Sequence, residues 1–423
     1  MNPNRFATHS LADPRILRIL SAALEAVDPA EAVRKFLPSV TGNVYGLGIG
    51  KASIPMLTAL AEAIPLSGAL AISKHDSGLS RNLFPVFLGS HPIPDSRSLE
   101  AGQRVLEFVS SLHEDDTLVC LISGGGSALV TAPYEGITLE DMQALTALLL
   151  SCGARIDEIN TLRRHLDRIK GGGLARATQA NIISLILSDV IGNPLEAIAS
   201  GPTVPNPTTN ADALEILRKY RLEQQISKSI LHTLESGNLL PNSQQLAVGL
   251  QSQNIIIGDN RLAARAALEQ AEREGFYAEI LTNELQGEAR EVGVALAKTL
   301  RVEITKRPRP FCLIAGGETT VTIQGNGKGG RNQELALAAV DELSDLENVL
   351  LISLATDGDD GPTDAAGAVA TGESARRAEA LGVDAAGHLS RNDAYVFFDA
   401  LGDLIRTGPS GTNVNDLMFL IAT

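Results

Sequence analysis

GGETTVTIQGNGKGGRNQELALAAV, residues 316–340, is the stretch that best indicates how this chain folds and what it binds. It follows an apolar run and leads into a helical run that begins at Asn332, so it predicts a strand, a glycine-rich loop and a helix in succession. Glycines let backbone amides close around an anion, and a helix N-terminus adds positive potential. The loop also carries Glu318, Lys328 and Arg331, and an arginine fork matches phosphate oxygens. We interpret the stretch as a phosphate-handling loop rather than a packing element.

The composition is typical of an α/β protein with more than one domain. A chain of 423 residues is too long for a single core. Hydrophobic residues make up 44% of it, aromatic residues make up 4%, and Trp is absent. Ala, Leu, Ile, Val and Gly dominate the sequence, which favours buried parallel strands covered by helices.

The charge pattern excludes some classes of partner. The net charge is −15 and there is no long basic run, so neither nucleic acid nor an anionic membrane surface is expected as a partner. No stretch of eighteen apolar residues predicts a membrane span, and the N-terminus has no apolar signal core. Cys120, Cys152 and Cys312 have neither a pairable framework nor metal-ligand spacing, which is typical of the reducing cytoplasm.

Short apolar strands alternate with helical segments along the chain. Helical spacing covers residues 11–37, and residues 139–169 are helical with a break near Cys152. In the first half, strands are predicted within 44–53, 69–73, 84–90, 117–130 and 181–190. This alternation predicts a parallel sheet with crossover helices. The pattern restarts at Asn254, with further strands within 311–319, 349–358 and 416–422.

A linker-like segment separates the two halves. We place the boundary near residue 240, which gives an N-terminal domain of residues 1–240 and a C-terminal domain of residues 241–423, with residues 1–42 packing on either one. Ligands of open α/β sheets bind beyond the carboxyl ends of the strands. Because polar, glycine-rich loops follow strands in both halves, the simplest arrangement is two α/β domains that face each other across a cleft.

Two short motifs of the first half can bind an anion. GLGIGKAS places Lys51 directly after a strand, but it is neither a full P-loop nor a full dinucleotide fingerprint, and a solvated surface lysine is an equally good interpretation. SGGGSA (123–128) should open a helix, where its amides favour an anion, although helix–sheet packing alone also demands tight turns. His91 lies in a stiff loop between prolines, which either lines a site or makes a structural turn.

Further candidates are basic and acidic residues near predicted strand and helix ends. In INTLRRHLDRIKGGGLA (159–175), Arg164 and Lys170 are candidates for anion binding, although a solvated basic face is the usual explanation for such a run. Asp189 and Asp357 follow strands, and such carboxylates suit Mg²⁺, a general base, or simply an exposed acidic turn. The loop TGPSGTNVND (407–416) either wraps a ligand or connects two elements.

Taken in order, eight motifs resemble the glycerate 2-kinase family of the MOFRL type, which is also described, historically, as hydroxypyruvate reductase. They are GIGKAS, SHPIPDS, LISGGGSAL, INTLRRHLDRIKGGGLA, SDVIGN with ASGPT, GGETTVTIQGNGKGGRNQE, TDGDDGPTDAAGA and TGPSGTNVNDL. The resemblance covers nearly the whole chain. It implies a Rossmann-like N-terminal domain with a mainly parallel sheet and a smaller C-terminal MOFRL domain. It also implies transfer of the ATP γ-phosphate to D-glycerate, generally giving 2-phosphoglycerate, with a divalent metal such as Mg²⁺.

The resemblance also implies roles for individual residues. Lys51 and Arg331 match the family's proposed key residues, and Asp189 joins them as a catalytic candidate. Metal or base roles fall to Asp189, Glu318 and Asp357. The expected substrate- and nucleotide-binding residues are Gly50, His91, Ser123, Gly124, Gly125, Gly126, Ser127, Arg164, Lys170, Gly316, Gly317, Glu318, Lys328, Gly329, Gly330, Asn332, Gly411 and Asn413. One departure is visible, because SDVIGN has Ile191 and Asn193 where the family usually shows proline and an acid.

Two other functions stay open beside the kinase. A nicotinamide-dependent hydroxypyruvate reductase would need a G-x-G-x-x-G turn directly after a strand, with an acid about 20 residues further on, and none of the predicted strands is followed directly by one. A non-catalytic nucleotide-binding regulator would bind ATP without turnover. The expected partners are D-glycerate and ATP, in a cytoplasmic protein that could form a homodimer.

Overall fold

The chain forms two compact units. A computed structural model describes residues 1–37, 39–40, 42–75, 83–236 and 252–423. The Lys51 unit is Pro29–Ile257, and the Arg331 unit combines Met1–Asp28 with Gly258–Thr423. The expected boundary near residue 240 lies outside the described residues. In the part of the chain that is described, no helix is both long enough and apolar enough to cross a membrane.

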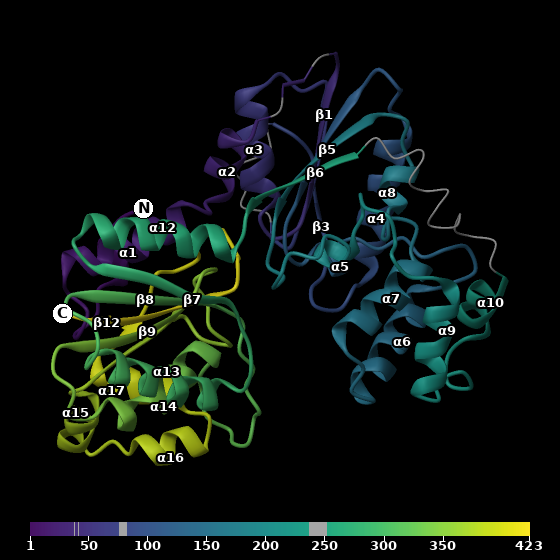
Figure 1. Ribbon diagram of the computed structural model, residues 1–423. Coiled ribbons are helices and arrows are strands. Elements are labelled where there is room, and N and C mark those ends of the chain that lie inside the picture. The colour runs from purple at the N-terminus through teal and green to yellow at the C-terminus, as the bar shows by residue number, and fades with distance from the viewer. Residues whose placement is uncertain (38, 41, 76–82, 237–251) are drawn as a thin grey trace. The chain divides into compact units, whose positions relative to one another are not determined.

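The Lys51 unit is built on a six-stranded sheet in the order β3-β2-β1-β4-β5-β6 (Figure 1). The neighbouring strands pair in parallel from β3 through β2, β1 and β4 to β5. The strands are β1 (Val44–Ile49), β2 (Gly68–Ser73), β3 (Val86–Leu88), β4 (Thr117–Ile122), β5 (Asn181–Leu187) and β6 (Ser252–Gly258). The order 3-2-1-4-5-6 is that of dinucleotide-binding domains, so the Rossmann-like prediction is confirmed.

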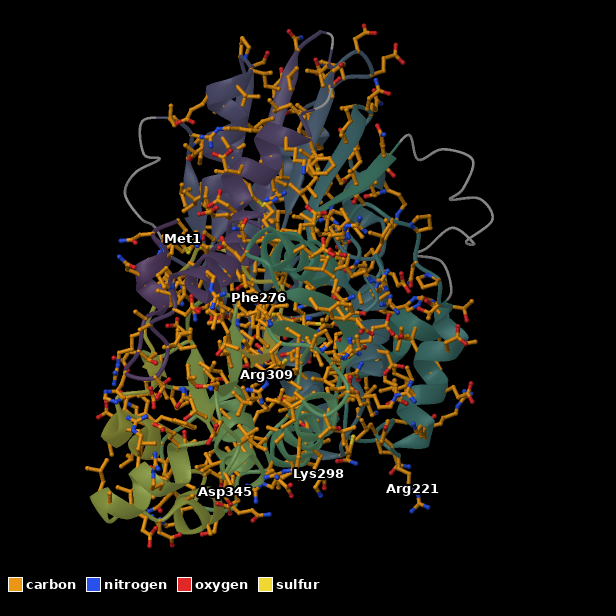
Figure 2. All side chains as sticks on the ribbon, turned by 60° about the vertical axis from the view of Figure 1, so that its left-hand side comes forward. Met1, Arg221, Phe276, Lys298, Arg309 and Asp345 are labelled. Atoms are coloured by element: carbon orange, nitrogen blue, oxygen red, sulfur yellow. The ribbon has the colours of Figure 1, made fainter. Side chains whose placement is uncertain are left out.

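Helices cover this sheet and extend beyond it. They are α2 (Pro29–Lys35), α3 (Ser53–Ala63), α4 (Ser96–Ser110), α5 (Gly126–Leu129), α6 (Leu139–Ser151), α7 (Ile156–Leu166), α8 (Gly173–Arg176), the 3₁₀ turn η2 (Ile198–Ser200), α9 (Asn210–Lys219) and α10 (Lys228–Ser236). Asp95 starts α4 with a capping box, and Thr138 does the same for α6. A second apolar cluster joins α6, α7, α9 and α10, apart from the core of the sheet. At the end of α9 the exposed side chain of Arg221 projects outwards (Figure 2).

The Arg331 unit has a mixed six-stranded sheet in the order β11-β10-β9-β12-β8-β7. Its strands are β7 (Tyr277–Leu285), β8 (Phe311–Gly317), β9 (Val349–Ala355), β10 (Gly367–Thr371), β11 (Leu404–Ile405) and β12 (Asp416–Ala422). Only β7 and β8 pair in parallel; β12 runs antiparallel to both of its neighbours. The start of β12 therefore lies at the same edge of the sheet as the ends of β8 and β9.

Two helical layers enclose this second sheet. The helices are η1 (Pro3–Phe6), α1 (Pro14–Glu25), α12 (Asn260–Arg273), α13 (Ala289–Glu303), α14 (Arg331–Leu343), α15 (Ser374–Leu381), α16 (Ala385–Ser390) and α17 (Ala394–Leu401). Figure 1 shows α1 and α12 side by side on one face and α13 with α14 on the other. α14 is buried along nearly its whole length, which explains its run of Ala and Leu.

The structure confirms most of the expected elements and corrects others. The strands β1, β3, β4, β5, β8, β9 and β12 all fall within predicted stretches, and β2 begins one residue before its predicted stretch. The break between α6 and α7 lies at Cys152 as expected. The strand that contains Asn254 differs, because β6 is the edge strand of the first sheet beside β5 rather than the opening strand of the second. The first forty residues divide between the units, with α1 packed on α12 and α2 packed on α3.

The three cysteines behave as the sequence indicates. All three are free thiols, and Cys120 and Cys312 are buried in the two sheets. Burial raises the pKa of both of these thiols to about 12, which leaves them unreactive.

Phe397 tests how the core of the Arg331 unit holds together. Its side chain is fully buried and meets the ring of Phe398 edge-on, with 5.1 Å between ring centroids. We expect Phe397→Ala to lower the free energy of unfolding by about 3–5 kcal/mol, because it removes apolar contacts and leaves a cavity. The neighbouring Val396, 46% exposed on the same helix, is the control, and its change to Ala should cost under about 0.5 kcal/mol. Urea unfolding of the full chain measures both, and equal losses would contradict this account.

Candidate functional sites

In the Lys51 unit, the turns after β1 and β4 are joined backbone to backbone. Lys51 donates its amide to the carbonyl of Gly124 at 3.0 Å, and Ser123 donates its amide to the carbonyl of Ile49 at 2.9 Å. A Cβ placed on Gly50 would lie 2.2 Å from Ser123 Oγ, so only glycine permits this approach. β1 and β4 flank the point where the strand order reverses, which is where ligands of such sheets bind.

Three side chains surround the glycine loop after β4. A Cβ placed on Gly125 would lie 3.3 Å from both Lys51 Cγ and His91 Cδ2. A Cβ on Gly124 would lie 2.0 Å from Asp189 Oδ2. The amides of Gly124 and Gly125 donate to no group within the described ranges. The loop thus brings together a cation, an imidazole and a carboxylate around open amides.

A strained turn supports the far side of the same loop. Ala199, Ser200 and Gly201 all have positive φ, at 50°, 60° and 62°. Such a run costs free energy for the two non-glycine residues and persists only when its surroundings impose it. Ser200 Oγ lies 2.7 Å from Ser127 Oγ and donates to Asn160 Oδ1 of α7 at 3.4 Å. The turn therefore fixes the glycine loop against α7.

The basic segment of α7 is arranged differently from the prediction. Arg164 is 4% exposed, and its guanidinium donates to Asn206 Oδ1, Thr161 Oγ1 and the carbonyl of Glu196. Lys170 is 2% exposed, with its ammonium 2.6 Å from Asp167 Oδ2. Both cations are thus occupied inside the unit, where they hold the segment in place.

The glycines after Lys170 also have a structural part. Gly171 donates its amide to Ser200, and Gly172 donates its amide to Gly201. Arg163, which sequence reasoning left out of the candidate set, makes no hydrogen bond or ion pair within the described ranges.

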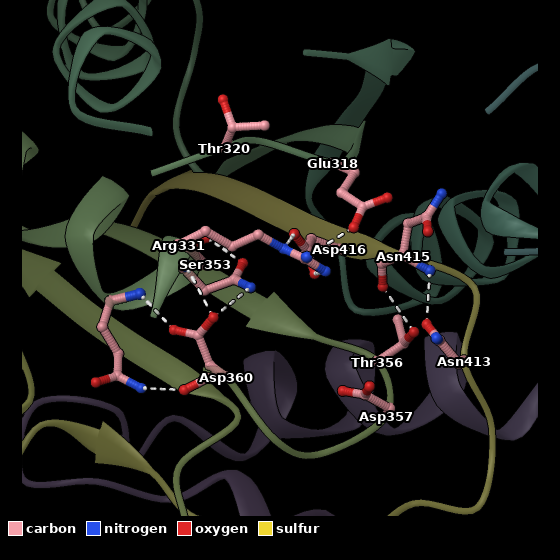
Figure 3. Close-up of polar contacts among 12 residues, drawn as sticks. Glu318, Thr320, Arg331, Ser353, Thr356, Asp357, Asp360, Asn413, Asn415 and Asp416 are labelled. Carbon is pink, nitrogen blue, oxygen red and sulfur yellow. Dashed lines mark hydrogen bonds and ion pairs between the residues drawn. The ribbon is translucent and has the colours of Figure 1, made fainter. Parts of the chain in front are cut away.

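In the Arg331 unit, Arg331 lies between two carboxylates (Figure 3). Its Nε and one terminal nitrogen bind the two oxygens of Asp416 at 2.6 and 3.0 Å, and the other terminal nitrogen lies 2.6 Å from Glu318 Oε1. Asp416 is fully buried, whereas the Glu318 side chain is 42% exposed. Burial alone would lower the pKa of Arg331, but the hydrogen bond to Asp416 and the negative charges of Asp416 and Glu318 together outweigh it, and the pKa is raised. Arg331 is therefore a permanent cation, and Asp416 holds one side of its guanidinium in place.

The positive end of α14 is not open to an anion as the sequence led us to expect. Asp360, 2% exposed, accepts the amides of Asn332 and Gln333 at 3.1 and 2.9 Å. Its carboxylate therefore occupies the place in which a phosphate was expected. Burial raises the pKa of Asp360 to about 7, and the charge of Asp416 acts in the same direction. Asn332 also accepts a hydrogen bond from Ser353 of β9, so it serves the scaffold.

Other groups hold the glycine-rich loop before α14. Asn392 Oδ1 accepts the amides of Gln324 and Gly325, and Lys328 donates its amide to Asp393. The ammonium of Lys328 lies 3.8 Å from the centre of the Tyr395 ring, a cation–π contact. Within the described residues, the amides of Gly329 and Gly330, next to Arg331, have no acceptor. The phosphate-handling part of the loop is thus shorter than the motif suggests.

The loop before β12 is fastened to the end of β9. Thr356 Oγ1 donates to the carbonyl of Asn415 and accepts the amide of Val414, and Ser410 donates its amide to the carbonyl of Asp357. Asn413 Oδ1 accepts the amide of Asn415, and Gly411 turns with a φ of 83°. These bonds place Asp357 and Asn413 at the same edge of the sheet as Asp416 (Figure 3).

Gly316 and Gly317 end β8 at this edge because nothing larger fits. A Cβ on Gly316 would lie 1.7 Å from Asn260 Oδ1, and one on Gly317 would lie 2.1 Å from the carbonyl oxygen of Leu285. These two glycines allow the close packing that places Glu318 beside Arg331.

Within the described residues, neither unit contains a complete protein cage for a metal. Among the described residues, no group of three or more His, Cys, Asp or Glu side chains is arranged to hold an ion. Mg²⁺ in kinases is held by one or two carboxylates together with substrate phosphates and water. The separate carboxylates of Asp189, Glu318 and Asp357 fit such shared coordination.

Sequence reasoning missed Asp416, Asp360 and Arg163. Asp416 had a signal, because it is a carboxylate at the start of the otherwise apolar strand DLMFLIA. Asp360 is one of several acids in the glycine-rich segment TDGDDGPTDAAGA, and nothing in the local sequence distinguishes it from the others. Arg163 could not be told from Arg164, since adjacent residues of a helix point about 100° apart and only the packing of α7 decides which one is inside.

The titration of His91 gives a pH test of the Lys51 site. Burial, together with the charges of Lys51, Lys74 and Arg163, lowers the pKa of His91 to about 4. Between pH 6.5 and 4 the folded chain therefore binds fewer protons than the unfolded chain. The contribution of the neutral His91 side chain to stability is complete above pH 6.5 and is lost as the pH falls. We expect His91→Asn to flatten the decline of the urea midpoint over that range. His232→Asn, at an exposed position on α10, is the control. Parallel curves for wild type and His91→Asn would contradict the assignment.

Comparison with known proteins shows the family of the chain. A family model described as a domain of unknown function, DUF4147, matches residues 15–235, and the MOFRL family model matches residues 311–416. Glycerate 2-kinase of Pyrococcus horikoshii is 39% identical over 426 residues, which cover 96% of each chain. D-glycerate 2-kinase of Thermotoga maritima is 41% identical and covers 95% of this chain and 96% of its own.

The fold agrees with these matches. The crystal structure of glycerate kinase from Thermotoga maritima superposes with a TM-score of 0.87 at 40% identity, covering 96% of this chain and 98% of that one. A relative from Agrobacterium vitis, 38% identical over 96% of this chain, bears the name of a hydroxypyruvate reductase. With both family models matched and relatives of 39% and 41% identity over 96% and 95% of its length, the chain belongs to the glycerate 2-kinase family of the MOFRL type.

Proposed function

We propose that the protein transfers the γ-phosphate of ATP to D-glycerate and forms 2-phosphoglycerate. Membership of the family makes the chain a kinase, and its relatives act on glycerate. The observation that carries the finer proposal is the set of groups around the glycine loop of the Lys51 unit: Lys51, open amides, and the carboxylate of Asp189. These are the groups that phosphoryl transfer to a hydroxyl needs, namely positive charge, anion-binding amides and a base.

In this proposal Asp189 and Lys51 have separate parts. The hydroxyl oxygen of glycerate attacks the γ-phosphorus, the bond from that phosphorus to the bridging oxygen breaks, and ADP leaves. Asp189 accepts the proton of the hydroxyl. Lys51 and the amides of Gly124 and Gly125 offset negative charge on the reacting groups.

Arg331 stabilises negative charge from the side of its guanidinium that faces Glu318. Asp416 binds one side of the guanidinium in a buried two-point contact, so the plane of the fork is fixed. Glu318 occupies the other side and is exposed to solvent, where a substrate anion can replace it. Gly329 and Gly330, with free amides beside Arg331, extend the same anion-binding surface.

The divalent metal belongs to the proposal as well. Mg²⁺ would be held by Asp189 of the Lys51 unit, or by Glu318 or Asp357 of the Arg331 unit, together with ATP phosphates, and when bound it would neutralise phosphate charge. We further propose that the enzyme works in the cytoplasm, where its unpaired thiols stay reduced. A homodimer is an expectation that sedimentation at micromolar concentration tests.

One experiment tests the reaction as a whole. The protein is incubated with ATP, Mg²⁺ and D-glycerate, and the product is identified by phosphorus and carbon NMR. Phosphate on the C2 oxygen supports the proposal, and phosphate on the C3 oxygen would correct its regiochemistry. Oxidation of NADH by hydroxypyruvate in the absence of ATP would favour a reductase, while ATP binding without turnover would indicate a regulator.

Removing either key cation should slow the reaction strongly. We expect Lys51→Ala and Arg331→Ala each to lower kcat/KM by at least about 100-fold, equivalent to about 3 kcal/mol of transition-state stabilisation. Steady-state kinetics with ATP and D-glycerate measure the effect, and circular dichroism checks that each variant is folded. A folded variant with near-wild-type activity would remove that residue from the mechanism.

Asp416 should act through Arg331 rather than on the substrate. We expect Asp416→Asn to lower kcat by about 10-fold or more, because an amide cannot hold both sides of the fork by accepting two charged hydrogen bonds. Asp403→Asn is the matched control, since Asp403 is also fully buried and pairs with an arginine, Arg377, in the same unit. Both changes should destabilise the unit, because each leaves a partly buried guanidinium poorly paired. Only Asp416→Asn should alter kcat, and equal kcat values for the two variants would show that Asp416 serves stability alone.

A further inference from the structure

Arg163 is an arginine without a counter-ion in a molecule that pairs most of its other arginines. It lies on α7, is partly buried, and makes no hydrogen bond or ion pair with any residue that the structure describes. Burial lowers its pKa, and the charge of Asp167 opposes this shift only in part. Asp167 is itself bound to the ammonium of Lys170 and the hydroxyl of Thr131, so it cannot serve as a partner for Arg163.

Holding such a cation costs stability. An ionised group that is moved out of water without a partner loses hydration, and the five N–H donors of Arg163 have no protein acceptor within the described residues. The next residue shows what the fold does when an arginine has a purely structural part, because Arg164 fills its hydrogen-bonding groups with Asn206, Thr161 and Glu196. Arg163 has no such set of acceptors, so a structural role does not explain it.

The surroundings of Arg163 are the glycine-loop site of the Lys51 unit. Asn160, one helical turn earlier on the same side of α7, accepts a hydrogen bond from Ser200, which in turn contacts Ser127 of the loop. Arg163 also acts on His91, together with Lys51 from the turn after β1 and Lys74 from the end of β2. Lys51 and Lys74, like Arg163, have no side-chain acceptor among the residues described.

Three uncompensated cations next to open amides make a site that is complete only with an anion. The nearby Asp189 supplies one negative charge at Gly124, and His91 is uncharged at neutral pH. An acidic protein that gathers three cations near a single carboxylate creates a local positive potential, which attracts and orients an anionic ligand. The planar fork of arginine then adds a two-point contact that a lysine cannot make.

We propose that Arg163 binds an anionic group of a substrate, either a carboxylate or a phosphate, at the glycine-loop site of the Lys51 unit. The proposal rests on the kinase function for the identity of that substrate. The carboxylate of D-glycerate and the phosphates of ATP are the two sources, and they share the chemistry that Arg163 recognises.

The test compares Arg163→Gln with Arg168→Gln in the full chain. Arg168 belongs to the same basic segment but is exposed, so its change removes the same charge without touching the site. Binding of D-glycerate and of ATP with Mg²⁺ is measured separately by titration calorimetry. We expect Arg163→Gln to weaken at least one ligand by about 10-fold or more, as for loss of a charge-assisted contact, while Arg168→Gln stays near wild type. Weaker D-glycerate binding identifies the carboxylate as the partner of Arg163, and weaker ATP binding identifies the phosphates.

The melting temperature provides a second readout, which distinguishes ligand binding from a structural role of Arg163. Since Arg163 has no partner to lose, Arg163→Gln should keep or raise the melting temperature while binding is lost. Arg163→Lys should restore part of the affinity, because it returns the charge but not the fork. Dissociation constants within twofold of wild type for both ligands would overturn the proposal, as would a loss of stability that accounts for the loss of binding.

The same design separates this inference from the kinase proposal. If the wild-type protein forms no phosphoglycerate, the kinase proposal fails, and titration with inorganic phosphate still compares the variants. A wild type that binds phosphate with an affinity that depends on Arg163 would support the inference alone. Equal phosphate binding by all variants would then overturn it.

Discussion

The ion pair between Arg331 and Asp416 is the contact on which the geometry of its unit depends. Asp416 starts the central strand β12, level with Gly317 of β8 and Ala355 of β9. A carboxylate buried at that position is tolerable only with a partner, because an unpaired one would cost several kcal/mol. Arg331 supplies the partner from the first residue of α14 and so links a helix start to three strand ends. The glycines that end β8 and precede α14 allow this close approach.

The two units handle charge in opposite ways. In the Arg331 unit, Arg331 meets two carboxylates and Asp360 occupies the amides at the start of α14, so the acids nearly saturate the positive groups. In the Lys51 unit, Lys51, Lys74 and Arg163 have no such acids within the described residues. The positive groups of the Lys51 unit are therefore open to an anion, whereas carboxylates already occupy those of the Arg331 unit.

The sequence predicted the scaffold well and the details of the sites less well. Apolar runs such as 117–122 and 181–187 marked strands because buried parallel strands need nothing but apolar side chains. β10 was missed because Gly367–Thr371 is a run of small residues with little β signal. The loop before α14 was expected to offer most of its amides, but Asn392, more than sixty residues further on, occupies two of them. Contacts between residues so far apart in the sequence produce no local sequence pattern that could predict them.

Glu318 explains how an acidic molecule can hold an arginine ready for a negatively charged substrate. Without a counter-ion, Arg331 would be a partly buried cation with a desolvation cost; with two buried carboxylates, it would be closed to any ligand. The structure lies between these extremes, because Asp416 is fully buried and Glu318 is 42% exposed. An exposed ion pair contributes little net free energy, since water and salt compete with it. A substrate anion therefore displaces Glu318 at low cost and leaves Asp416 in place, so the orientation of the fork survives the exchange of its outer partner.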